Sequence, residues 1–149
     1  MQSFCQRDPR WNDLKLGESC LTLGRFGCTT TAIADLSTYF GDNFTPELVA
    51  KTVTYTKDGL IIWQSCVFPH FQFSSREYGR NDKQLKNALY DPNQAVILQV
   101  NKGSHWVVLV GTLIGRFGYY TIADPWFGDR TSIKRYNDDI TGAAYFTRK

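Results

Sequence analysis

The feature that most constrains the fold of this chain is a series of short apolar segments in its last third. Residues 95–100 and 105–110 are almost entirely apolar and rich in β-branched side chains, and residues 119–123 follow the same pattern. Turn-forming residues separate these segments, at 101–103 and at 111–115. Short β-branched segments with such connections are typical of antiparallel strands. We expect a C-terminal antiparallel sheet, with two weaker strands at residues 132–136 and 143–147.

Helical patterns come earlier in the chain, after an irregular arm at residues 1–27. Ile33, Leu36 and Phe40 recur at steps of three and four residues, which predicts a helix that begins at Cys28. Gly41 follows this segment as a plausible C-terminal cap.

Two further helix starts lie between that helix and the strands. Thr45-Pro46-Glu47 combines a capping side chain, a preset φ angle and an anion in the first turn. Asn81 is a second capping residue, and Asp91-Pro92 ends the helix that it starts. Because helices precede antiparallel strands, the order of elements predicts an α+β fold.

Size and composition favour one globular domain over residues 1–149. Apolar residues make up 42% of the chain and charged residues 21%, and no repeat or Pro/Gly-rich linker divides it. The formal net charge is +3, with Lys and Arg dispersed. A nucleic-acid-binding protein usually carries a denser basic stripe, so we expect no nucleic-acid partner. We also expect a monomer.

The four cysteines, Cys5, Cys20, Cys28 and Cys66, have spacings that match no zinc-binding pattern. We expect no metal and no cofactor. A Cys5–Cys20 disulfide stays open as an alternative for an oxidising compartment. Otherwise the cysteines are expected to be free thiols, most of them buried.

Cys28 is the first candidate catalytic residue. It follows Gly27 at a helix start, where the helix dipole stabilises a thiolate and free backbone N–H groups can bind an oxyanion. Gly27 has no side chain to keep a substrate backbone away. The plainer alternative is a buried structural cysteine, because Cys is among the most buried residue types.

A histidine and an aspartate supply the partners that a thiol nucleophile needs. His105 opens an apolar strand and titrates near neutral pH by residue type, so it can take and return a proton. Asp124 ends the next strand and can orient an imidazole. Taken alone, His105 could be a capped strand-end residue and Asp124 part of an Asp-Pro turn.

The strand order brings these two residues together. In an antiparallel pair the start of one strand lies beside the end of the next, so His105 and Asp124 can meet. Cys28 then needs its helix packed across that edge of the sheet. The sequence therefore predicts a nucleophile, a base and an orienting carboxylate in one site.

These segments together resemble the C39-like branch of the papain-like cysteine peptidases. Each segment is short, but their order and joint presence are specific, and they cover most of the chain. The segments that carry the resemblance are Gln6-Arg7-Asp8-Pro9-Arg10-Trp11, Gly27-Cys28, Gly41 to Thr45-Pro46, His105-Trp106-Val107-Val108 and Asp124-Pro125-Trp126-Phe127-Gly128.

The resemblance implies a papain-like fold, with a central N-terminal helix packed on the C-terminal sheet. It also implies hydrolysis of a peptide or amide bond through a thioester, with Cys28, His105 and Asp124 as the triad. Gln6 matches the glutamine that supplies an oxyanion donor, although it lies far ahead of Cys28, so the arm has to fold back. Gly27 and two of the four tryptophans, Trp106 and Trp126, are candidate substrate-binding residues.

Members of this broad family cut proteins, leader peptides or bacterial cell-wall peptides, so the expected partner is a peptide, a protein or peptidoglycan. No apolar run reaches the roughly 20 residues that cross a bilayer, and residues 1–8 lack the order of a signal peptide. We expect no membrane insertion. The cytoplasm is the expected place as made, with release or carriage in a virion if the chain is a phage cell-wall enzyme.

Three other interpretations stay open. The domain could be a catalytically silent scaffold that grips a protein or cell-wall partner, or it could transfer the acyl group to an amine instead of water. Cys66 and His70 could also form a second dyad or half a metal site. Pro69 lies between those two residues and argues against one helical face carrying both.

Overall fold

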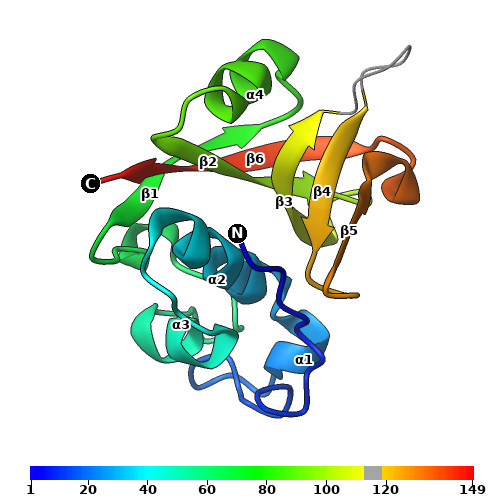
Figure 1. The fold of residues 1–149 in the computed structure, drawn as a ribbon. Coiled ribbons are helices and arrows are strands. Elements are labelled where there is room, and N and C mark those ends of the chain that lie inside the picture. The colour runs from blue at the N-terminus through cyan, green and yellow to red at the C-terminus, as the bar shows by residue number, and fades with distance from the viewer. Residues whose placement is uncertain (113–118) are drawn as a thin grey trace.

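Six antiparallel strands form one sheet in the computed structural model, which describes residues 1–112 and 119–149 (Figure 1). The strand order is β1-β6-β2-β3-β4-β5. The expected α+β class is therefore confirmed. The elements are the helices α1 (Leu23–Phe26), α2 (Cys28–Phe40), α3 (Pro46–Thr52) and α4 (Asp82–Leu89), the 3-10 helices η1 (Trp63–Ser65) and η2 (Ile133–Tyr136), and the strands β1 (Phe71–Tyr78), β2 (Gln94–Val100), β3 (His105–Thr112), β4 (Tyr120–Asp124), β5 (Asp129–Ser132) and β6 (Ile140–Arg148).

The middle of the sheet follows the sequence pattern closely. A tight turn joins β2 to β3 with Asn101, Lys102 and Gly103 all at positive φ, and Val100 pairs with His105 across it. Val108 of β3 pairs with Ala123 of β4. The first residue of β3 and the last residue of β4 therefore lie at the same end of this strand pair.

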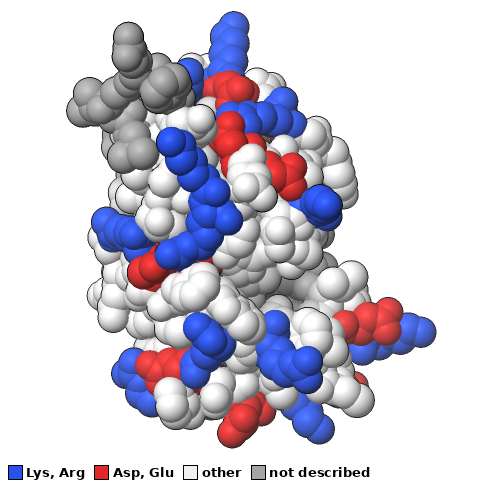
Figure 2. Space-filling view, turned by 90° about the vertical axis from the view of Figure 1, so that its right-hand side faces the viewer, with Lys and Arg blue, Asp and Glu red and all other residues white. Residues whose placement is uncertain are grey.

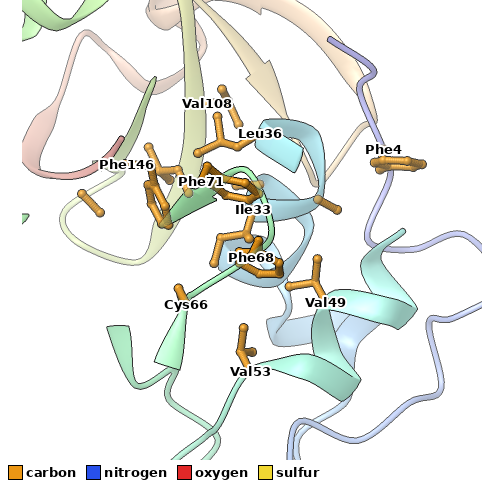
Figure 3. Close-up of a cluster of buried hydrophobic side chains, with 14 of the residues drawn as sticks. Phe4, Ile33, Leu36, Val49, Val53, Cys66, Phe68, Phe71, Val108 and Phe146 are labelled. Atoms are coloured by element: carbon orange, nitrogen blue, oxygen red, sulfur yellow. The ribbon is translucent and has the colours of Figure 1, made fainter. Parts of the chain in front are cut away.

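The two faces of the sheet pack against different helices. Alternate residues of a strand point to opposite faces, and α2 packs against β2 and β3 on one face while α4 packs against the same strands on the other (Figure 1). Each face has its own apolar cluster. Figure 3 shows the α2 side, where Ile33, Leu36, Val108 and Phe146 are fully buried.

The helix caps form where the sequence places them. Gly41 has φ 94°, a left-handed conformation that ends α2 and that glycine adopts without strain. The Thr45 and Asn81 side chains accept hydrogen bonds from backbone N–H groups in the first turns of α3 and α4.

Several boundaries differ from the expected ones. Residues 133–136 form the 3-10 helix η2 instead of a strand, because the Ser132 side chain accepts a hydrogen bond from Lys134 N and caps that turn. Residues 111 and 112 belong to β3 and not to the turn expected at 111–115, and the last three residues of that expected turn lie outside the described part of the chain. The arm at residues 1–27 contains the short helix α1.

Strand β1 has no counterpart among the expected elements. It lies at one edge of the sheet and pairs with β6, and its middle residues, Ser74 and Ser75, are exposed. An edge strand with a polar centre gives little β-branched signal. In the described part of the chain, no helix has the length and apolar character needed to cross a bilayer.

Candidate active site

The helix start at Cys28 is shaped by the glycine before it. Gly27 is the N-cap of α2, and its N–H donates to the carbonyl oxygen of Leu23 at 2.7 Å. A Cβ built on Gly27 would lie 2.5 Å from that same oxygen. Gly27 is buried in this junction between α1 and α2 and does not line the surface pocket that contains Cys28 and His105. Its small size therefore allows the close approach of two helices and not that of a substrate backbone.

We expect Gly27→Ala to destabilise the protein by about 1–3 kcal/mol, because the neighbouring Leu23 backbone has to move to admit a methyl group. Urea unfolding monitored by circular dichroism measures the change. Gly111→Ala is the matched control, since there the nearest atom is the Thr121 hydroxyl, on a side chain that can rotate. Equal unfolding free energies for the two variants would contradict the tight α1–α2 junction.

His105 and Asp124 meet where β3 begins and β4 ends, as their strand positions require. The distance between His105 Nε2 and Asp124 Oδ1 is 2.8 Å. The Cys28 side chain is close enough to the imidazole to act on its charge, and Cys28 and His105 line the same pocket. Since Nε2 faces the carboxylate, Nδ1 is the ring nitrogen left for the sulfur. The structure thus brings the three expected triad residues together in the order thiol, imidazole, carboxylate.

The surroundings of His105 favour its charged form. Burial lowers the pKa of the imidazole, but the hydrogen bond to Asp124 and the interaction with the nearby Cys28 side chain outweigh burial and raise this pKa to about 9. His105 is therefore an imidazolium at neutral pH. An imidazolium in contact with a cysteine stabilises the thiolate, which is the reactive form of the nucleophile.

Asp124 is held by more groups than the sequence suggested. Its side chain is fully buried, and Oδ2 accepts hydrogen bonds from Tyr136 Oη at 2.5 Å and Arg135 Nη1 at 3.0 Å. Trp126 N donates to Oδ1 at 3.0 Å. Burial raises the pKa of Asp124, but the hydrogen bonds from His105, Tyr136 and Arg135 outweigh burial and lower this pKa to about 2. The carboxylate is ionised over the whole neutral range.

Arg135 and Tyr136 are thus site residues that sequence reasoning missed. Arg135 also makes a two-pronged ion pair with Asp129, at 2.8 Å for each contact. Both residues belong to η2, which follows β5 and turns back over the end of β4. The sequence shows two neighbouring hydrogen-bond donors, Arg135 and Tyr136, shortly after Asp124. The strand expected at 132–136 would point their side chains to opposite faces of the sheet, so they were not expected to meet at one carboxylate.

The N-terminal arm folds back to the site, as the position of Gln6 requires. Gln6 N donates to the carbonyl oxygen of Pro125 at 2.8 Å, and its side-chain Nε2 donates to the carbonyl oxygen of Gly24 at 3.2 Å. Gln6 is 1% exposed and lines the groove beside Cys28. The bond to Gly24 uses one of the two amide hydrogens, so the other stays available as a donor.

A groove of about 640 Å³ runs past these residues. This volume lies within the range of small-molecule and peptide pockets. Trp106 and Trp126 both line it, as expected of substrate-binding candidates, while Trp11 is buried in the core and Trp63 packs against Trp106. The rest of the wall is largely apolar and includes Leu16, Leu21, Phe26, Tyr55, Leu60, Ile61 and Phe127.

The second dyad is not formed. Cys66 is fully buried, and burial raises the pKa of its thiol to about 12. The His70 ring instead pairs with Asp42 through Nδ1, and His70 is exposed. Pro69 and His70 form the exposed bend before β1, whereas Cys66 lies in the core.

The remaining thiols also stay apart. All four cysteines are free, so the Cys5–Cys20 disulfide is not formed, and Cys20 is exposed. Among residues 1–112 and 119–149, no three His, Cys, Asp or Glu side chains gather as metal ligands would.

Comparison of the chain with protein-family models, with curated proteins and with solved structures finds no match in any of the three. The functional argument therefore depends on the geometry and electrostatics of the groove.

Proposed function

We propose that this protein is a cysteine peptidase or amidase with a papain-like fold, related to the C39-like branch. One observation carries the proposal: the His105 imidazole is hydrogen-bonded to the buried Asp124 carboxylate and interacts with the Cys28 side chain, and Cys28 and His105 both line an open groove. The order of these residues along the chain and their places on a helix start and two adjacent strands support the same class.

The proposed reaction begins with the Cys28 sulfur attacking the carbonyl carbon of an amide. A thioester forms, the C–N bond breaks, and the His105 imidazolium gives its proton to the departing amine. His105, now neutral, takes a proton from water as the water attacks the thioester, and the acid and thiolate are released. Asp124 fixes the imidazole orientation and stabilises its charge throughout.

Two donors suit the negative charge that develops on the carbonyl oxygen. The second amide hydrogen of Gln6 Nε2 is one. The backbone N–H of Cys28 is the other, because N–H groups in the first turn of a helix have no partner within the helix. Gln6 is bound to Gly24 of α1 and Cys28 begins α2, so the same α1–α2 segment holds both donors.

Peptides are the proposed substrates, including protein and bacterial cell-wall peptides, and water is the proposed acceptor. The test is digestion of purified peptidoglycan and of a denatured-protein pool, with the products read by mass spectrometry. Protein alkylated beforehand with iodoacetamide is the control. New amide-bond cleavage products that vanish after alkylation support hydrolysis. Conjugates to an added amine would indicate acyl transfer instead, and tight binding with no products in either pool would favour the silent binding domain.

The pH dependence of the rate follows from His105. Because its raised pKa keeps the imidazole protonated below about pH 9, loss of that proton removes the acid that the leaving amine needs. We expect kcat/KM to fall as the pH rises through about 9. Initial rates on a cleaved peptide at constant ionic strength measure this, and a rate still rising above that pH would contradict the charged form of His105.

A further inference from the structure

The charges that line the groove have one sign. Its lining includes the guanidinium groups of Arg25 and Arg135, and no Asp or Glu of the described residues belongs to it. Asp124 lies behind the imidazole with its side chain fully buried. Figure 2 shows the hollowed face of the molecule, where uncharged surface surrounds the hollow and charged side chains of both signs lie farther out. An occupant of the groove therefore meets cations and apolar surface.

The two arginines differ in how their charge is balanced. Arg135 is paired with both Asp124 and Asp129, at 3.0 and 2.8 Å. Arg25 is exposed, and the contact of its guanidinium is with the ring of Phe26, 5.7 Å from the ring centroid. No carboxylate in the described part of the chain lies within ion-pair distance of Arg25. Its positive charge is thus uncompensated at the groove wall.

The position of Arg25 ties this charge to the reacting carbonyl. The residue before it, Gly24, accepts the hydrogen bond from the Gln6 amide, and Cys28 begins the next helix. Arg25 thus stands on the wall that carries the nucleophile and the proposed oxyanion donors. The Arg7 guanidinium stacks on the ring of Trp126, a lining residue, at 4.5 Å, and it also has no carboxylate partner among the described residues.

We propose that the groove selects peptides with a carboxylate close to the scissile amide, and that Arg25 is the residue that binds this carboxylate. The inference rests on the proposed function, since it takes the groove as the substrate site. A guanidinium presents two parallel N–H donors that match the two oxygens of a carboxylate. Arg25 is therefore a specificity-determining residue, and its effect weakens as salt screens the exposed charge.

A pair of small alkylating reagents tests this without turnover. Iodoacetate and iodoacetamide have nearly the same size, and iodoacetate carries a carboxylate. With either reagent the Cys28 sulfur bonds to the methylene carbon as the C–I bond breaks, and iodide leaves with the electron pair. The rate of alkylation by iodoacetate divided by the rate by iodoacetamide, measured at each cysteine by peptide mass spectrometry, reports the preference for an anion. Exposed Cys20 is the internal reference.

We expect this ratio to be higher at Cys28 than at Cys20, and Arg25→Gln to lower it at Cys28 by about three- to tenfold at low ionic strength. Lys83→Gln is the matched control, because it removes the same charge from an exposed position on α4, away from the groove. The His105 charge acts in all three proteins, so the difference between variants isolates Arg25.

The outcomes separate the two proposals. A ratio in Arg25→Gln equal to that of the wild type would overturn the role of Arg25 and leave the hydrolase proposal in place. Failure of Cys28 to react faster than Cys20 with either reagent would count against the activated thiol itself, and so against the proposed function.

Peptide protection extends the test to the proposed substrate class. Capped alanine pentapeptides with a central Glu, Gln or Lys are added to slow the alkylation of Cys28 by iodoacetamide. We expect protection in the order Glu, then Gln, then Lys, with the advantage of Glu over Gln reduced in Arg25→Gln. Equal protection by the Glu and Gln peptides in the wild type would overturn the selectivity.

Discussion

Cys28→Ala is expected to lower kcat/KM by more than about a thousandfold, because alanine has no atom that can form the thioester. The thiol is half-buried at the groove wall, so its loss leaves a small gap that water can fill and the fold should persist. Product formation by mass spectrometry and unfolding in urea, measured on the same preparation, separate loss of chemistry from loss of structure.

Cys20→Ala is the matched control for this variant. Cys20 is exposed and lies outside the groove lining, so its removal tests whether thiol loss in general affects the rate. We expect unchanged turnover in Cys20→Ala. Cys28→Ala protein that folds and still forms products at the wild-type rate would end the cysteine-hydrolase proposal.

Asp124→Asn is expected to reduce kcat/KM by about 10²- to 10⁴-fold, because an amide cannot stabilise the imidazolium as a carboxylate does. Asp124, which accepts the hydrogen bond from the imidazole, is also one of the two residues whose interactions raise the pKa of His105. The alkaline limb of the rate should therefore move to lower pH. Full pH–rate profiles of the variant and the wild type measure both effects.

The same substitution should also cost stability. Asp124 accepts hydrogen bonds from an imidazole, a phenol, a guanidinium and a backbone N–H. An asparagine amide group turns a donor toward one of these donors, which costs about 1–3 kcal/mol. Urea unfolding measures this loss.

Asp129→Asn is the control for both effects. Asp129 binds the same arginine but is half-exposed and makes no contact with His105 in the described structure. We expect it to change the rate and the unfolding free energy less than Asp124→Asn does. Equal rate losses in the two variants would show that Asp124 acts through Arg135 and not through the imidazole.

Sequence patterns predicted the parts of the site that depend on local structure. A glycine before a helical pattern placed Cys28, and the hairpin geometry of adjacent strands placed His105 beside Asp124. These relationships involve neighbouring elements with short connections, for which periodicity and antiparallel pairing are sufficient.

The residues that escaped prediction reach the site through less regular segments. Arg135 and Tyr136 lie on a 3-10 helix, whose geometry gives no clear period in so short a stretch. The free charge of Arg25 could not be foreseen, because pairing depends on where every carboxylate lies in space. Strand β1 was missed because its polar middle resembles a loop.

The proposed nucleophile and the proposed base belong to different layers of the molecule: Cys28 begins a helix, and His105 begins a strand of the sheet on which that helix packs. Their separation is therefore a measure of how closely helix and sheet are seated on each other. A substitution at an interlayer contact outside the site, such as Ile33 or Val108, would change the spacing between the sulfur and the imidazole. The reactivity of one thiol thus offers a sensitive readout of loosening inside this protein before it unfolds.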